Sequence, residues 1–493
     1  MAQAQRFVIS NFLGGLAPSV FVGNPLNQAD PGSASNTHTR GWEVFSNGEI
    51  GSLQRGYTTA PVTNVSLVQG TMFWMKSYNR SIGTFLFMLG TDDNLILNRL
   101  LRLDLSNDTV SNSGGFPHSI STYTNAQQGG TGMEFFGGYL YYASGRYLGR
   151  YDMSLTFNDS FNVFLGTQAL GDGIDHPMVQ GGGKLFIGNS NFSLNTPCIA
   201  TVDSAGSVNL AALDLSQTEQ IIKALEYSRN FLYIATTNNT TQNTNSSDSF
   251  LYIWDGISGS WQEQFKFPEE NFTALKYVGS QLFCFGNRGF YRFTGSGFEL
   301  IYPITGGPSA GGVSVHPNGI LYFRDQTGLI YAYGTANPQI PPIVYRPYSE
   351  SSAFIGAIHW ASRTKLFASR LTGDNKTLKL YSASGTEAYS TNAAYYVPMI
   401  EFGVRTRLVK VYIEFLAWPA GDTMDVKWYT GDGDTPTPTT IGTINTTGEL
   451  SAEFYPDGCV ADHWGVALAL TAAPNGVTPK IRRVICEYQV EKE

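Results

Sequence analysis

The chain has 493 residues and a formal net charge of −8 at pH 7, with 42% hydrophobic and only 14% charged residues. A chain of this length is too long for one ordinary hydrophobic core and is typical of two or three domains. The thinly spread negative charge lacks the basic footprint of a protein that binds duplex nucleic acid, and no apolar run is long enough for a membrane-spanning helix.

Residues 1–57 form the first distinct segment, which is rich in Gly, Pro, Ser and Asn and shows little hydrophobic periodicity. Such a composition is typical of an extended leader. Apolar side chains near its start, among them Phe7, Val8 and Ile9, favour burial, so we expect an ordered arm rather than a disordered tail. The N-terminus lacks a basic stretch followed by a long apolar core, and we expect no secretory signal.

Residues 58–394 carry a repeated unit, of which "YLYYASGRYLGRY" from Tyr139 to Tyr151 is the clearest copy. Each copy has a strand beginning with Leu and an aromatic residue, a turn, and a returning strand. The leucine recurs at steps of 39 to 54 residues, at Leu86, Leu140, Leu185, Leu232, Leu282, Leu321 and Leu366. A further alternating strand lies upstream of each copy.

Repeats of this length with about four strands each are typical of β-propeller blades, because a single sheet buries its faces only when packed against neighbours. We therefore predict about seven blades, with six or eight as alternatives. The segment from Val62 to Gly70 is the expected closing strand, pairing with the last blade near "TEAYSTNAAYY". Because side chains alternate along a strand, we expect about half of the repeat aromatics in the core and the rest facing a partner.

Residues 395–493 change pattern again and contain short alternating strands, including 409–415 and 424–429. Their number and spacing predict a small, jelly-roll-like β-sandwich. The turn that begins at Gly431 holds Asp432 and Asp434, whose carboxylates suit calcium. The distal Glu of a calcium loop is missing, so we expect a solvated turn.

No catalytic constellation stands out in the chain. The six histidines include no HExxH pair, and the four cysteines are scattered, so we interpret the cysteines as buried apolar residues, with a Cys459–Cys486 pair as the alternative. "GPSAG" around Ser309 matches the nucleophile-elbow pattern but links two β segments. Paired carboxylates of a glycosidase stay possible, although most acidic residues fall in turns. We predict no catalytic, cofactor or metal residues and assign no binding residues.

Two ends of the chain resemble structural proteins of tailed bacteriophages. The leader "FLGGLAPSVFVG" and the following "GWEVFSNGEIGSLQRGY" are similar to the opening of those proteins. The segment after Glu401, the hairpin at Trp428 and the closing "TPKIRRVICEYQ" from Thr478 are similar to their terminal β-sandwich. The architecture also resembles the propeller hub or nozzle proteins of short-tailed phages, which form rings below the portal.

The resemblance implies a non-enzymatic structural protein of the virion tail, assembled in the host cytoplasm. It implies a homo-oligomeric ring that docks on portal, adaptor or tail proteins, with no membrane insertion. DNA in transit would pass such a ring without specific binding, because the mild negative charge of the protein does not attract DNA. The alternatives are a receptor- or glycan-binding tail protein, with the Asn-rich loop 236–249 as a recognition surface, and a propeller glycosidase or lyase.

Overall fold

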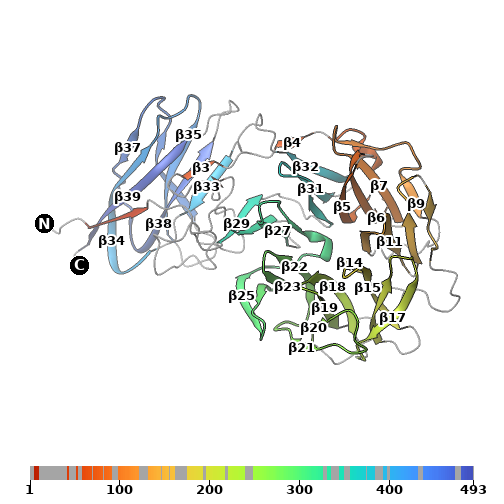
Figure 1. Cartoon of the computed structure of the whole chain (residues 1–493). Coiled ribbons are helices and arrows are strands. Elements are labelled where there is room, and N and C mark those ends of the chain that lie inside the picture. The colour runs from red at the N-terminus through yellow and green to blue at the C-terminus, as the bar shows by residue number, and fades with distance from the viewer. Residues whose placement is uncertain are drawn as a thin grey trace. The chain divides into compact units, whose positions relative to one another are not determined.

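The computed structural model describes residues 5–9, 42–43, 51–53, 58–60, 62–68, 70–80, 83–91, 98–120, 132–145, 147–154, 156–161, 175–191, 196–216, 220–238, 248–325, 330–334, 343–348, 356–372, 375–382, 392–396, 400–430, 437–471 and 479–491. Nearly all regular structure in them is β-strand, as predicted. The chain divides into two compact units (Figure 1). One unit comprises 61–328 and 351–380, and the other comprises 1–60, 329–350 and 381–493.

The repeats form successive antiparallel sheets, each ordered as in the sequence. The first sheet contains β5 (Met72–Arg80), β6 (Gly83–Thr91), β7 (Asn98–Asp104), β8 (Thr109–Val110) and β9 (His118–Ile120). The second contains β10 (Gly132–Phe136), β11 (Tyr139–Ser144), β12 (Tyr147–Tyr151) and β13 (Phe157–Asn158). The third contains β14 (Met178–Gly181), β15 (Lys184–Asn191), β16 (Thr196–Val202) and β17 (Val208–Asp214).

The later repeats follow the same order. The fourth sheet contains β18 (Gln220–Ser228), β19 (Phe231–Asn238), β20 (Phe250–Trp254) and β21 (Glu263–Lys266). The fifth contains β22 (Phe272–Val278), β23 (Gln281–Gly286), β24 (Gly289–Phe293) and β25 (Phe298–Pro303). The sixth contains β26 (Val313–Val315), β27 (Leu321–Arg324), β28 (Ile330–Gly334) and β29 (Ile343–Tyr348). The seventh contains β30 (Ile358–Trp360), β31 (Lys365–Thr372), β32 (Asn375–Ser382) and β4 (Thr58–Ala60).

These sheets form a β-propeller, which confirms the predicted architecture, but they are not seven equal blades. Six of the sheets have the four strands of a regular blade. The sheet of the first repeat has five, because β9 pairs with β7 beside β8. The predicted count of about seven is therefore corrected to six regular four-stranded blades.

The predicted closing strand was wrong. The outer strand of the seventh sheet is β4, which ends before Val62. The expected segment instead contains a short 3-10 helix, η2 (Val65–Leu67), preceded by Asn64 with φ 57°. A left-handed residue interrupts extended backbone, and among the described residues of this segment the strand pairing is a single parallel bridge, from Thr63 to Thr109.

The hairpin of the clearest repeat is buried on both faces. Tyr142 and Tyr151 pack with Phe87 of the first sheet, whereas Tyr141, on the opposite face of β11, packs with Leu185 of the third. All three tyrosines are at most 2% exposed. Alternation along the strand therefore does not separate core from exposed aromatics here, because a blade lies between two neighbouring blades. Tyr139 and Tyr147 are half-buried, and that such residues face a partner stays a prediction.

The remaining strands form one ten-stranded hydrogen-bonded network. Its main path runs through β2 (Trp42–Glu43), β3 (Gly51–Leu53), β39 (Lys480–Val490), β34 (Ile400–Phe415), β38 (Val460–Thr471), β35 (Thr423–Thr430) and β36 (Thr437–Ile444). Off this path, β1 (Gln5–Ile9) pairs with β39, β33 (Asn392–Tyr396) with β38, and β37 (Ser451–Phe454) with β34. Its core includes the buried Phe415, Trp418 and Trp464.

The expected N-terminal arm contributes strands to this network. Five consecutive residues of β1 pair with β39, from Gln5 opposite Tyr488 to Ile9 opposite Val484. The strand β3 pairs farther along the same strand, through Gly51 and Ser52. The two ends of the chain therefore share one sheet, while the expected domain boundaries at 57 and 394 stay predictions.

Candidate functional site

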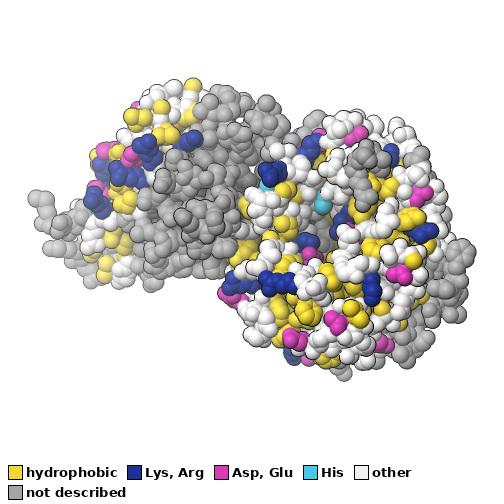
Figure 2. All heavy atoms as spheres, viewed as in Figure 1, with side chains coloured by type: hydrophobic (Ala, Val, Ile, Leu, Met, Phe, Trp, Pro, Cys, Tyr) yellow, Lys and Arg dark blue, Asp and Glu magenta, His cyan; other side chains and the backbone are white. Residues whose placement is uncertain are grey.

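A cavity lies at the centre of the propeller, and the first strand of every repeat contributes residues to its wall. Its volume is about 290 Å³, and all of its lining residues belong to the unit of 61–328 and 351–380. Figure 2 shows a hollow in this part of the molecule, with cationic, acidic and histidine side chains in it. We take this cavity as the candidate functional site.

The charged side chains come from one equivalent position in each repeat. On each first strand, this position is paired with the aromatic residue that follows the repeated leucine. The pairs are Lys76–Phe87, Glu134–Tyr141, Val179–Phe186, Glu226–Tyr233, Lys276–Phe283, Ser314–Tyr322 and His359–Phe367. Since residues in the same register lie at the same level of a propeller, these first-strand residues form a ring around the cavity, called here the channel ring.

Two ion pairs lie in the channel ring. Nζ of Lys76 is 2.7 Å from Oε2 of Glu134, whose other oxygen accepts a hydrogen bond from the Phe135 amide. Nζ of Lys276 is 3.1 and 3.3 Å from the two carboxylate oxygens of Glu226. Burial disfavours the charged form of Lys76, but Glu134, together with the field of Glu226, outweighs it and raises the pKa of Lys76.

His359 is neutral in this environment. Its Nε2 accepts a hydrogen bond from the backbone amide of Ser77 at 3.1 Å and lies 3.0 Å from the Ser77 hydroxyl. Burial, followed by the positive charges of Lys76 and Lys276, lowers the pKa of His359 to about 3. Because Nε2 acts as an acceptor, the ring proton belongs on Nδ1.

A short 3-10 helix, η5 (Ala310–Gly312), contributes Ala310 and Gly311 to the cavity wall and packs against β5, β22 and β30. It approaches β5 so closely that a Cβ on Gly311 would lie 1.9 Å from the carbonyl oxygen of Phe73. Ser309 of the "GPSAG" match precedes η5 and is exposed. Among the residues that the structure describes, no hydrogen bond joins it to a histidine.

The other residues that the sequence offered as candidates do not form a site among the described residues. All four cysteines are buried and unpaired, so the Cys459–Cys486 alternative is wrong. Asp432 and Asp434 lie outside the described residues. Within the described ranges, no three His, Cys, Asp or Glu side chains come together as a metal site, and no helix is long and apolar enough to cross a membrane.

The residues of the channel ring were not identified as a site from the sequence, although His359 was counted among the histidines. A signal was present, because each ring residue lies on the strand before a repeated leucine. The signal could be recognised only from the strand pairing, because the distance in sequence between ring residue and leucine varies. Lys76 precedes Leu86 by ten positions, and Glu134 precedes Leu140 by six. Strand length causes this variation, because four residues lead from Lys76 to Arg80 at the turn but only two lead from Glu134 to Phe136.

No protein-family model and no curated protein sequence matches the chain. Similar solved structures include the extracellular domain of a putative one-component system from B. thetaiotaomicron, at 13% identity and TM-score 0.45, covering 67% of this chain and 41% of that one. The propeller domain of the Trilobed protease from Pyrococcus furiosus matches at 11% identity and TM-score 0.31, covering 66% and 90%. A glycoside hydrolase family 43 arabinoxylan arabinofuranohydrolase from Bacillus subtilis matches at 10% identity and TM-score 0.31, and the match covers 89% of this chain and 99% of that one. The chain thus spans less than half the length of the first of these proteins.

Proposed function

We propose that this chain is a non-enzymatic structural component of a tailed-phage virion, a tail hub, nozzle or tail-associated ring protein. One observation carries the proposal beyond the sequence resemblance. Within the resembling segments, β3 of residues 41–57 pairs with β39 of the C-terminal segment, and β1 pairs with the same strand β39. An ordered sheet built from both ends offers a docking module separate from the propeller.

The finer parts of the proposal concern architecture and partners. Residues 395–493 would form a jelly-roll-like sandwich, completed by the N-terminal strands. The chain would assemble as a homo-oligomeric ring and contact portal, adaptor or tail proteins. The net charge of −8 would let DNA pass such a ring without specific binding.

The chemistry of the channel ring supports a non-enzymatic role. A glycosidase needs two carboxyl groups with different roles, one as the acid and the other as nucleophile or base. Here Glu134 and Glu226 occupy equivalent positions, and each is paired with a lysine of the ring, so their surroundings do not divide these two roles between them. The basic nitrogen of His359 is engaged by Ser77.

Quantitative mass spectrometry of purified particles tests the proposal, using particles produced by the genome that encodes this chain. We expect the chain at a fixed, multiple copy number per particle, and imaging of the particles should place it in the tail. Particles that are complete but lack the chain would overturn the proposal. Turnover of a polysaccharide by the purified chain, lost on Glu134→Gln, would support the glycosidase alternative instead, and saccharide binding without turnover would support the glycan-binding one.

A further inference from the structure

The channel ring is electrostatically polarised. Four consecutive positions around it, contributed by the fifth, sixth, seventh and first sheets, are Lys276, Ser314, His359 and Lys76. The other three positions are Glu134, Val179 and Glu226, from the second, third and fourth sheets. Both lysines therefore lie on one side of the cavity, here the donor wall, and both glutamates lie on the other, the acceptor wall.

The donor wall retains hydrogen-bond donors on residues that line the cavity. Ser314 Oγ accepts a hydrogen bond from the Trp360 amide at 2.9 Å, which leaves its own hydroxyl proton to donate. The proton on Nδ1 of His359 has no acceptor among the described residues. Lys76 directs one ammonium hydrogen to Glu134, and an ammonium group carries three.

The acceptor wall presents negative charge beside an apolar surface. Glu134 is 8% exposed, and the side chain of Glu226 is 14% exposed. Val179 lies between them in the ring, and Pro177 and Met178 extend the apolar lining. A carboxylate accepts several hydrogen bonds, so each glutamate can bind a ligand ammonium in addition to its lysine.

These two walls favour a ligand that carries both charges. A dianion would be repelled by the two glutamates, and a dication by the two lysines. The volume of about 290 Å³ is at the small end of ligand pockets, which begin at roughly 300 Å³. We propose that the cavity binds a small zwitterion of the amino-acid class, with its carboxylate on the donor wall and its ammonium on the acceptor wall.

The proposal is independent of the virion role and can be tested on the purified full-length chain. Isothermal titration calorimetry would compare the common L-amino acids and γ-aminobutyrate with sodium acetate, methylammonium chloride and inorganic phosphate. We expect saturable binding of at least one zwitterion, at least about tenfold tighter than acetate or methylammonium, because only a zwitterion uses both walls.

Variants of the ring identify the site. The double variant Lys276→Met/Glu226→Gln removes one ion pair without leaving an unpaired charge, and should weaken zwitterion binding by about tenfold, as expected for the loss of a charged hydrogen bond. Lys266→Met is the matched control, since Lys266 pairs with the exposed Asp248 and does not line the cavity. It should bind as the unmodified chain does.

Two results would overturn the proposal. One is the absence of saturable binding for every zwitterion up to about 10 mM, with a thermal transition that shows the chain to be folded. The other is binding of acetate or phosphate as tight as that of any zwitterion, because this would make the cavity a plain anion site.

Discussion

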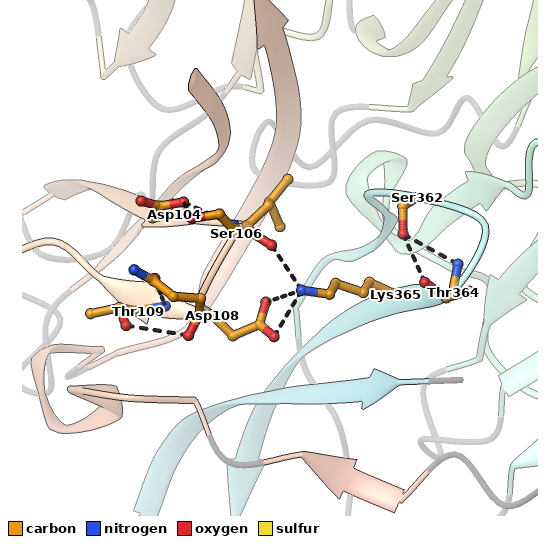
Figure 3. Close-up of polar contacts among 9 residues, drawn as sticks. Asp104, Ser106, Asp108, Thr109, Ser362, Thr364 and Lys365 are labelled. Atoms are coloured by element: carbon orange, nitrogen blue, oxygen red, sulfur yellow. Dashed lines mark hydrogen bonds and ion pairs between the residues drawn. The ribbon is translucent and has the colours of Figure 1, made fainter. Parts of the chain in front are cut away.

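The ammonium group of Lys365 lies 2.7 and 2.8 Å from the two carboxylate oxygens of Asp108, although the residues are 257 positions apart (Figure 3). The same Nζ is 2.8 Å from the carbonyl oxygen of Leu105. Lys184, at the same place in its own repeat, contacts the Gly256 carbonyl oxygen of the next sheet at 3.1 Å. Lys365 therefore makes the same kind of contact between the last repeat and the first that Lys184 makes between the third and the fourth.

Replacing Lys365 should weaken ring closure. The side chains of Lys365 and Asp108 are 22% and 20% exposed, so Lys365→Met leaves a partly buried carboxylate without its partner. We expect the free energy of unfolding of the propeller to fall by about 1–2 kcal/mol, measured by urea denaturation. In the control Lys266→Met, the broken pair is 65% and 39% exposed, and the loss should stay under about 0.5 kcal/mol. Equal losses would show that the Lys365 contact is an ordinary surface pair.

Gly311 should not tolerate a side chain. The added Cβ of Gly311→Ala would meet the Phe73 carbonyl oxygen at 1.9 Å, and backbone must move to relieve this contact. We expect the free energy of unfolding to fall by about 1–3 kcal/mol, measured as a lower midpoint of urea denaturation. Gly259→Ala is the control, because no heavy atom lies within 4 Å of its added Cβ, and it should change stability by less than about 0.5 kcal/mol. An unchanged midpoint for Gly311→Ala would mean that η5 moves freely.

His359 should make stability fall in mild acid. Its pKa is about 3 in the folded chain, below the ordinary value of 6.5, so between these values the unfolded state binds more protons. The contribution of His359 to the free energy of unfolding is therefore complete above pH 6.5 and is lost as the pH falls toward 3. His359→Gln keeps an acceptor for Ser77 but does not titrate. The decrease in unfolding free energy between pH 7.0 and 4.5 should therefore be smaller in the variant, by on the order of 1–2 kcal/mol. Parallel pH profiles would contradict the assignment.

Removing residues 1–10 should expose the strand β39. The pairing of Gln5–Ile9 with 484–488 would be lost, and the freed amides of β39 would become accessible to water. We expect hydrogen exchange in 484–488 to accelerate at least about tenfold, measured by mass spectrometry. Peptides from β18 and β19 in the propeller serve as the internal control and should not change. Unchanged protection of β39 would mean that β1 contributes nothing to this sheet.

Local patterns predicted much of the propeller. The repeated leucines, from Leu86 to Leu366, are at most 3% exposed. They were recognisable because strand alternation and turn residues act over a few positions, and the recurrence of such units predicts a propeller. The regularity also misled, since it predicted about seven blades, whereas six of the sheets are regular four-stranded blades and the first repeat carries the additional strand β9.

The channel ring could not be predicted in the same way. Lys76 and Glu134 are 58 positions apart, and their contact depends on how adjacent blades pack. The pairing of His359 with Ser77 spans 282 positions and exists only because the ring closes. The burial of Tyr141 and Tyr142 also depends on blade packing, because these tyrosines lie on opposite faces of β11 and a neighbouring blade covers each face.

By itself, the sequence determined the all-β class, the repeated unit and its buried leucines, because these follow from side-chain alternation and short turns along the chain. The tertiary structure alone decided which strand closes the propeller, that the N-terminal segment joins the C-terminal sheet, and which charges face one another in the cavity. Those features depend on contacts between residues far apart in the chain, and such contacts form only when the sheets have packed into a closed ring.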